Sequence, residues 1–159
     1  MAVDSKDVLR HLLSTIAYRL ARCVNNASPG FFTMKTANEI RNPEEIIRHM
    51  SQVLRAFTSK IENKSIEELP PLGYEDELKR FYNLLKRADL SLQHSELCDA
   101  LVFKLVQGPL ADLLGHIGQI AMLRRFYNEP VKGENFMNSN IRVGVVEREN
   151  QDLSMTLFD

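Results

Sequence analysis

This 159-residue sequence has almost no net charge, only two cysteines and no long uninterrupted apolar run. The formal net charge is −1, from 20 basic and 21 acidic residues, so the basic surplus typical of nucleic-acid-binding proteins is missing and direct DNA binding is not expected. Cys23 and Cys98 match no zinc or redox spacing, and we expect both to be buried, reduced thiols. No window shows the roughly 20 apolar residues that span a bilayer.

The N-terminal stretch and the composition indicate one soluble domain. The segment MAVDSKDVLR lacks a basic start followed by an apolar core, so no secretion signal is expected. Hydrophobic residues make up 44% and charged residues 26% of the chain, and its length suffices for one core. We therefore expect a soluble, cytoplasmic protein with a single domain over residues 1–159.

Helical periodicity and end signals predict the first three helices. The first follows Asp4 and runs to about Val24. The second follows the cap Asn42, has Pro43 in its first turn, and continues to about residue 60. The third opens with three acidic residues at 75–77, which suit the positive end of a helix dipole.

The rest of the chain is less regular. The apolar stretch CDALVFKLVQ (98–107) could be helix or strand, and we favour helix. The Gly-Pro step at 108–109 is expected to interrupt it and to begin a last helix that runs to about Tyr127. Residues 131–159 read as an irregular extension in which IRVGVV (141–146) is the only candidate strand. These elements predict an all-α fold, a four-helix bundle with an extended C-terminal tail.

Three polar side chains stand in the otherwise apolar run ADLLGHIGQIAMLRR (111–125). At 100° per residue, Asp112, His116 and Gln119 fall within about 60° of one another on a helix. The remaining faces are apolar or small, so we expect the helix to be buried nearly all round. An unpaired buried carboxylate costs several kcal/mol, and Asp112 is therefore expected to have a cation, a donor network or a metal as its partner.

An aspartate and a histidine four residues apart can hold one ion, but a stable site needs a third ligand from a facing helix. His49 is the best-placed histidine, on the second helix at the edge of its apolar face. His11 lies on a polar face and His94 in a turn. The spacing therefore predicts a site made of His49, Asp112 and His116.

A structural interpretation of the same residues stays open. Asp112 and His116 can pair with each other and with Gln119 as a satisfied polar network, and His49 can be an ordinary boundary residue. The spacing alone does not distinguish this network from a metal site.

Three segments resemble a known family. The stretch LVQGPLADLLGHIGQIAMLRRFYNEPVKGENF (105–136) resembles the last helix and exit segment of the DinB/YfiT-like superfamily of bacterial four-helix-bundle metalloproteins. NPEEIIRHMSQVL (42–54) resembles its second helix, and YEDELKRFYNLL (74–85) its third. The similarity covers most of residues 41–136.

The resemblance implies a metal triad of one histidine from the second helix and two residues, usually histidines, from the last. His49 matches the first position, and His116 matches the last because the family pattern there ends in Gly-Gln, as at 118–119. The middle position falls on Asp112, where many relatives have histidine. A His₂Asp set is harder and more anionic than His₃; it suits zinc or nickel first, and manganese or iron also.

Three further side chains have weaker signals. Gln119 can orient a ligand or a bound water from the second shell of a metal, or can bond a neighbouring helix backbone. Arg124 and Arg125 can clamp an anionic group at the mouth of the site, or can be ordinary cations at a helix C-terminus. The cysteines are not implied as ligands.

The leading hypothesis is a metal-dependent enzyme of the DinB-like type. A metal with an open position activates a bound water or holds a thiol as thiolate, and characterised relatives imply the second chemistry, in a transferase dependent on a small thiol. The alternative is a non-catalytic dimeric bundle that binds a small ligand or partner. The resemblance also implies a homodimer, for which the small-residue face of the last helix could serve, and neither a nucleic-acid nor a membrane partner is expected.

Overall fold

The computed structural model describes residues 4–154, and every regular element in that range is helical, as the all-α prediction requires. The end of the predicted C-terminal tail, residues 155–159, lies outside the described residues. The long helices are α1 (Ser5–Val24), α3 (Pro43–Glu62), α4 (Tyr74–Gln93) and α6 (Ala111–Phe126). The short elements are α2 (Pro29–Phe32), α5 (Asp99–Leu105), the π-helical turn η1 (Val106–Leu110), and the 3₁₀ turns η2 (Phe136–Asn138) and η3 (Arg148–Asn150).

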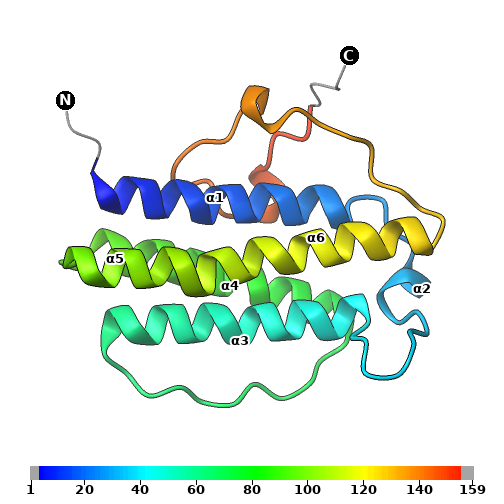
Figure 1. The fold of residues 1–159 in the computed structure, drawn as a ribbon, viewed down its shortest axis with the longest axis horizontal. Coiled ribbons are helices and arrows are strands. Elements are labelled where there is room, and N and C mark those ends of the chain that lie inside the picture. Colours follow the sequence, from blue (N-terminus) through cyan, green and yellow to red (C-terminus); the bar gives the residue numbers. More distant parts are fainter. Residues whose placement is uncertain (1–3, 155–159) are drawn as a thin grey trace.

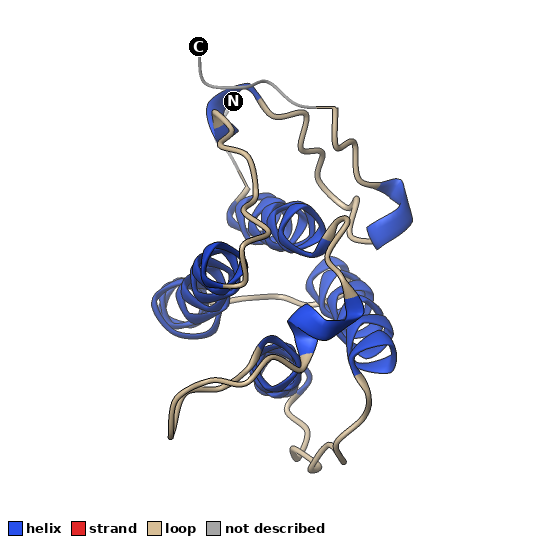
Figure 2. Ribbon diagram, turned by 90° about the vertical axis from the view of Figure 1, so that its right-hand side faces the viewer, coloured by secondary structure: helices blue, strands red, loops and turns tan. Residues whose placement is uncertain are grey.

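The four long helices lie side by side around a common apolar core (Figures 1 and 2). α1 packs against α4 and α6, and α3 packs against the same two helices. The linker 63–73 returns along the length of the molecule, so α3 and α4 run in the same direction (Figure 1). Two ion pairs agree with this direction: Arg48 early in α3 meets Glu77 early in α4, and Glu62 at the end of α3 meets Arg87 late in α4.

The start of α3 is the best-determined boundary in the sequence, and the structure confirms it. The side chain of Asn42 accepts a hydrogen bond from the Glu45 amide at 2.9 Å, and the Glu45 carboxylate accepts one from the Asn42 amide at 2.8 Å. This reciprocal cap satisfies two amides that would otherwise lack partners. It fixes where α3 begins, and hence which turn of the helix carries His49.

The Gly-Pro step at 108–109 does not interrupt the helix, so that prediction is wrong. Instead the chain passes through η1 and continues without a break from α5 into α6. Pro109 has no amide hydrogen and its ring crowds the preceding turn, and the wider π-turn accommodates both features. The prediction of helix for 98–107 is confirmed for Asp99–Leu105.

The continuous helix from Asp99 to Phe126 is long and apolar enough to cross a membrane, judged by length and composition only, with a mean hydropathy of 1.2 in its most apolar 18-residue window. The expectation that no segment reaches this apolarity is therefore wrong by this criterion. The support for a membrane span is weak, because a core helix of a soluble protein meets the same criterion. In this structure Leu113 and Ile120 of α6 are fully buried in the core.

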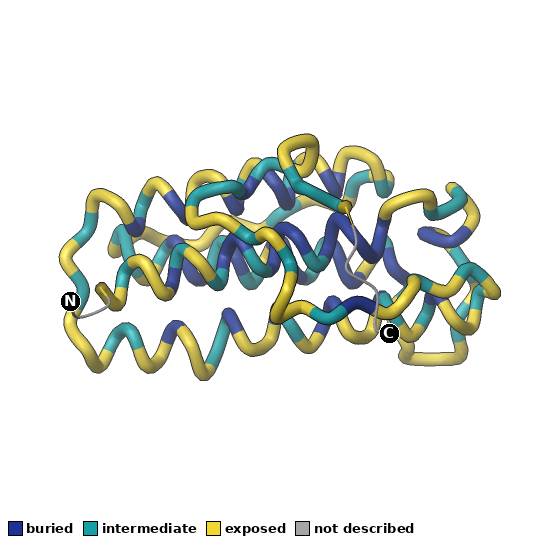
Figure 3. The backbone as a smooth tube through the Cα atoms, turned by 90° about the horizontal axis from the view of Figure 1, so that it is seen from above, coloured by how far each residue is buried: buried dark blue, intermediate teal, exposed yellow. Residues whose placement is uncertain are grey.

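α6 is buried on one side only, contrary to the expectation that it is buried nearly all round. Gly115 and Gly118 face open space, and a Cβ atom added at either would meet nothing within 4 Å. Met122 is 59% and Phe126 74% exposed. Figure 3 shows the same division along each long helix, with buried residues toward the centre and exposed residues outside. Composition alone therefore overstated the burial of this helix.

The segment after α6 crosses α1 without forming a strand, so the prediction of a strand at 141–146 is wrong (Figure 1). Within the described residues no second strand is available to pair with it. The segment is held instead by side chains of α1: the Gly144 amide donates to Ser14 Oγ at 3.1 Å, and Arg22 Nε lies 2.7 Å from Glu134 Oε2. Tyr18 also donates a hydrogen bond to the fully buried Glu134 side chain.

The two cysteines differ in exposure. Cys23 is buried, and burial raises the pKa of its thiol to about 11, so it is a poor nucleophile at neutral pH. Cys98 is exposed at the start of α5, which corrects the expectation that both thiols are buried.

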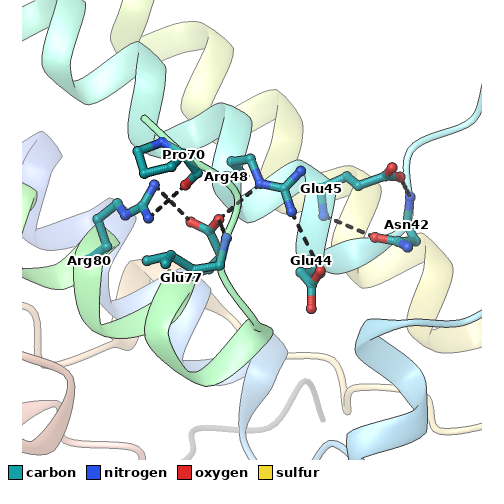
Figure 4. Close-up of polar contacts among 8 residues, drawn as sticks. Asn42, Glu44, Glu45, Arg48, Pro70, Glu77 and Arg80 are labelled. Carbon is teal, nitrogen blue, oxygen red and sulfur yellow. Dashed lines mark hydrogen bonds and ion pairs between the residues drawn. The ribbon is translucent and has the colours of Figure 1, made fainter. Parts of the chain in front are cut away.

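The buried carboxylate of Glu77 joins α3, α4 and the linker between them (Figure 4). Its Oε1 accepts from Arg48 Nε at 2.9 Å and from the Leu72 amide at 3.0 Å. Arg80 lies 3.7 Å from the other carboxylate oxygen and donates to the Pro70 carbonyl at 2.8 Å. The charge is therefore neutralised where it is buried, and it fixes the first turns of α3 and α4 relative to each other.

Substituting Glu77→Gln is expected to lower the free energy of unfolding by about 2–3 kcal/mol, because Arg48 and Arg80 lose their carboxylate partner in a largely buried setting. Urea titration followed by circular dichroism measures the change. The exposed Glu68→Gln serves as the matched control and is expected to shift stability by less than about 0.5 kcal/mol. Equal effects of the two substitutions would contradict this account of Glu77.

Glu62 closes the opposite end of α3. Its carboxylate contacts Arg87 Nη2 at 2.8 Å, Ser91 Oγ at 2.6 Å and Lys64 Nζ at 2.9 Å. The hydrogen bond from Arg87, followed by those from Ser91 and Lys64, lowers the pKa of Glu62 to about 2. The stabilisation is present above the ordinary glutamate pKa and is lost as the pH falls through the lowered value.

We expect wild type to exceed Glu62→Gln in stability by about 1 kcal/mol at pH 6, a modest value because Arg87 is mostly exposed and its charge is screened. The difference should shrink as the pH falls below about 4.5 and should be lost once the pH has fallen through about 2. Thermal unfolding across this pH range measures it, and Glu96→Gln, at an exposed site, controls for the change in net charge. A difference that stays constant down to pH 2 would contradict the assigned pKa.

Candidate metal centre

The structure brings the three predicted ligands together where α3 packs against α6. His49 lies in the second turn of α3, and Asp112 and His116 lie one turn apart on α6. One ligand atom from each residue lies within 4.8 Å of the other two. The predicted juxtaposition of these three side chains is therefore observed. His11 on α1 and His94 after α4 are exposed and do not join the group.

Asp112 lies between the two imidazoles. His116 Nε2 is 3.3 Å from Asp112 Oδ1, and His49 Nε2 is 3.9 Å from Asp112 Oδ2. The two rings are perpendicular, with centroids 4.8 Å apart. Both Nε2 atoms therefore face the same carboxylate, and the three residues surround one point.

A glutamine three residues further along each helix holds the other ring nitrogen. Gln119 Oε1 lies 3.0 Å from His116 Nδ1, and Gln52 Oε1 lies 3.4 Å from His49 Nδ1. With the glutamine oxygens facing the rings as the structure places them, Nδ1 is the hydrogen donor of each contact. In a neutral imidazole this leaves the lone pair on Nε2, the atom that faces Asp112. Gln119 therefore contacts His116, one of the predicted ligands.

This arrangement leaves an electrostatic mismatch that a cation removes. His116 Nε2 is buried and makes no hydrogen bond. With Nδ1 protonated, it presents a lone pair toward the carboxylate of Asp112, so two acceptors face each other. A positive ion between them satisfies both at once, and for this reason the residues fit a divalent metal.

His49 is held in the form that binds metals. Burial lowers the pKa of His49, and the nearby charge of Arg41 lowers it further. A neutral imidazole is the metal-binding form, so no proton has to be removed at neutral pH before coordination.

The group is open to solvent on one side. Asp112 is 49% exposed and His49 30%, whereas His116 is only 9% exposed. The expectation that Asp112 is buried is therefore wrong: it lies on the exposed side of α6. Three protein ligands with one side open are the arrangement found in catalytic rather than structural zinc sites.

The structure does not bring the two C-terminal arginines of α6 to this group. Arg124 is buried, donates to the Glu129 carbonyl at 2.7 Å and lies over the Phe31 ring. Arg125 lines a separate hollow between α1 and α6, beside Cys23 and near the chain that follows α6. Their placement matches the structural alternative, in which they are cations at a helix C-terminus.

Sequence reasoning missed two residues near the site. Gln52 holds His49 as Gln119 holds His116, and the signal was present as the repeated pattern His-x-x-Gln, HMSQ on α3 and HIGQ on α6. Arg41 precedes α3 and acts on His49 through its charge. No local pattern marks that contribution, because it depends on how the connector before α3 folds.

No family model, curated protein or solved structure matches this chain. The chemistry of the site therefore has to be argued from the residues themselves, together with the resemblance of the three segments quoted above.

We expect His116 to carry its proton on Nδ1 in the metal-free chain at pH 8, and Gln119→Leu to shift the proton toward Nε2, where Asp112 can accept it. Long-range ¹H–¹⁵N correlation spectra distinguish the two tautomers. Gln52→Leu is the matched control, because it removes the corresponding contact of His49 and should leave His116 unchanged. An Nε2-protonated His116 in the wild-type chain would contradict the assigned geometry.

Proposed function

We propose that this chain is a metal-dependent enzyme of the DinB-like type, with a four-helix bundle that carries a His/Asp/His centre. His49, Asp112 and His116 hold one divalent transition metal, zinc or nickel first and manganese or iron also. The observation that carries the proposal is the buried Nε2 of His116, which lacks a hydrogen bond and faces a carboxylate. In a structural network that atom would instead carry a hydrogen and donate it to Asp112.

Each residue has a distinct role in this proposal. The two glutamines orient the imidazoles so that both Nε2 lone pairs point at one position. Asp112 supplies the anionic oxygen, and its exposure leaves room for another molecule to approach. A divalent metal bound there lowers the pKa of a coordinated thiol or water.

The resemblance favours a transferase that uses a low-molecular-weight thiol. In such a reaction the thiol sulfur forms a bond to an electrophilic carbon, the bond from that carbon to its leaving group breaks, and the thiol proton passes to solvent. Neither cysteine is suited to replace the external thiol, because Cys23 is buried and Cys98 lies at the start of α5, away from the group.

The alternative, a non-catalytic dimeric bundle with a buried polar network, receives less support. Such a network requires Asp112 to be enclosed and paired, whereas its side chain is 49% exposed. A homodimer and a bacterial origin belong to the proposal through the resemblance alone, and a cytoplasmic location through the expectation drawn from the sequence. The open face at Gly115 and Gly118 is compatible with packing against a second copy.

The proposal predicts near-stoichiometric transition metal in untagged protein, measured by mass spectrometry, or uptake of one Zn²⁺ per chain on titration. His49→Ala and His116→Ala should abolish binding, because two ligands do not make a stable site. His94→Ala, at an exposed histidine outside the group, is the matched control and should bind normally.

The substitution Asp112→Asn distinguishes the metal-dependent enzyme from the non-catalytic bundle. A metal centre should lose at least tenfold in Zn²⁺ affinity while the metal-free variant unfolds like wild type, because the side chain is half exposed. A structural network should lose stability whether or not metal is present. No metal in the purified chain and no uptake of zinc, nickel or manganese would overturn the metal-dependent proposal.

A further inference from the structure

A cleft of about 740 Å³ lies beside the metal centre, within the range of small-molecule sites. Its walls are the connector between α2 and α3, the first turn of α3 and the last turns of α6, which Figure 1 shows at the same end of the molecule. The apolar side chains that line it are Met34, Ile40, Ile46, Met122, Leu123 and Phe126.

Two residues join the cleft to the metal centre. Gln119 lines the cleft and also holds His116 at 3.0 Å. Arg41 lines the cleft directly before α3, the helix that carries His49. A molecule in the cleft therefore reaches Gln119, the residue that contacts His116.

Several apolar side chains of the lining are largely exposed to solvent. Ile40 is 54%, Met122 59% and Phe126 74% exposed. They come from two segments distant in sequence and meet along one cleft, and grouped exposed apolar side chains of this kind mark binding surfaces.

The charged groups of the cleft leave a positive balance. Arg41 and Lys35 line it together with one carboxylate, Glu39. Within the described part of the chain, neither Arg41 nor Lys35 forms an ion pair, whereas most of the other arginines do. An anionic group near Arg41 would therefore find a free guanidinium.

We propose that the cleft binds a small organic molecule with an apolar chain or ring and one carboxylate, which is held at Arg41 beside the metal centre. The apolar body lies along Met122 and Phe126, where it removes exposed apolar surface from water. The identification of this molecule as the substrate rests on the proposed function. Its binding in the cleft does not depend on that function. A metal would offset the charge of Asp112, so metal and carboxylate should strengthen each other's binding.

Calorimetric titration of the full chain with octanoate and octan-1-ol, each with and without one equivalent of Zn²⁺, tests the proposal. The two probes share an apolar chain and differ in charge. We expect octanoate to bind the metal-free chain more tightly than octanol. Arg41→Gln should weaken octanoate binding about tenfold, the loss of one charge-assisted hydrogen bond, and should leave octanol unchanged.

Two further variants complete the test. Arg125→Gln is the matched control, an exposed arginine of α6 that lines a different hollow, and it should bind both probes normally. Met122→Gln should weaken both probes, because it removes apolar contact without changing charge.

The outcomes distinguish this proposal from the proposed function. Octanoate binding that depends on Arg41 supports the cleft even if the chain takes up no zinc, which would overturn only the metal centre. Zinc uptake without probe binding overturns the cleft alone, as does equal binding of both probes with no effect of Arg41→Gln. A concentration-dependent dimer that Met122→Gln dissociates, with no probe bound, would mean that a second copy occupies the cleft, and would also overturn the proposal.

Discussion

The carboxylate of Glu77 is the constraint on which the site depends. It is completely buried, and it gathers Arg48, Arg80 and the amide of Leu72 from three separate parts of the chain. A charge in that position tolerates only small displacements of α3 along α4, because any larger shift would leave it unpaired. Arg48 precedes His49 directly. The contact that sets the position of α3 therefore also sets the height at which His49 meets α6.

In the candidate metal centre, both imidazoles have neutral partners. Each imidazole is paired with a glutamine on its own helix, three residues further along. Carboxylates in those positions would favour the imidazolium and remove the lone pair that coordination needs. The only acid of the group, Asp112, lies between the rings. Two glutamines and one central carboxylate thus surround the position that a cation would occupy.

The sequence was most informative where one local rule decides the outcome. The cap at Asn42 and the i, i+4 spacing of Asp112 and His116 are such cases, because hydrogen bonding and helix geometry settle them within a few residues. The Gly-Pro step and the segment 141–146 were misjudged because their outcome depends on distant contacts, the packing of a continuous helix and the side chains of α1. The exposure of Asp112 was misjudged for the same reason, since periodicity identifies a face of α6 but not the side on which α1 and α3 lie.

The π-turn at Val106–Leu110 determines how α6 is rotated about the helix axis relative to α5. Such a turn is what one extra residue leaves in an otherwise regular helix. Without that residue, α6 would be turned by about 100° relative to α5, and Asp112 and His116 would point away from α3. The fold class and the length of the helix would hardly change. One residue more or less in this turn therefore decides whether Asp112 and His116 face His49.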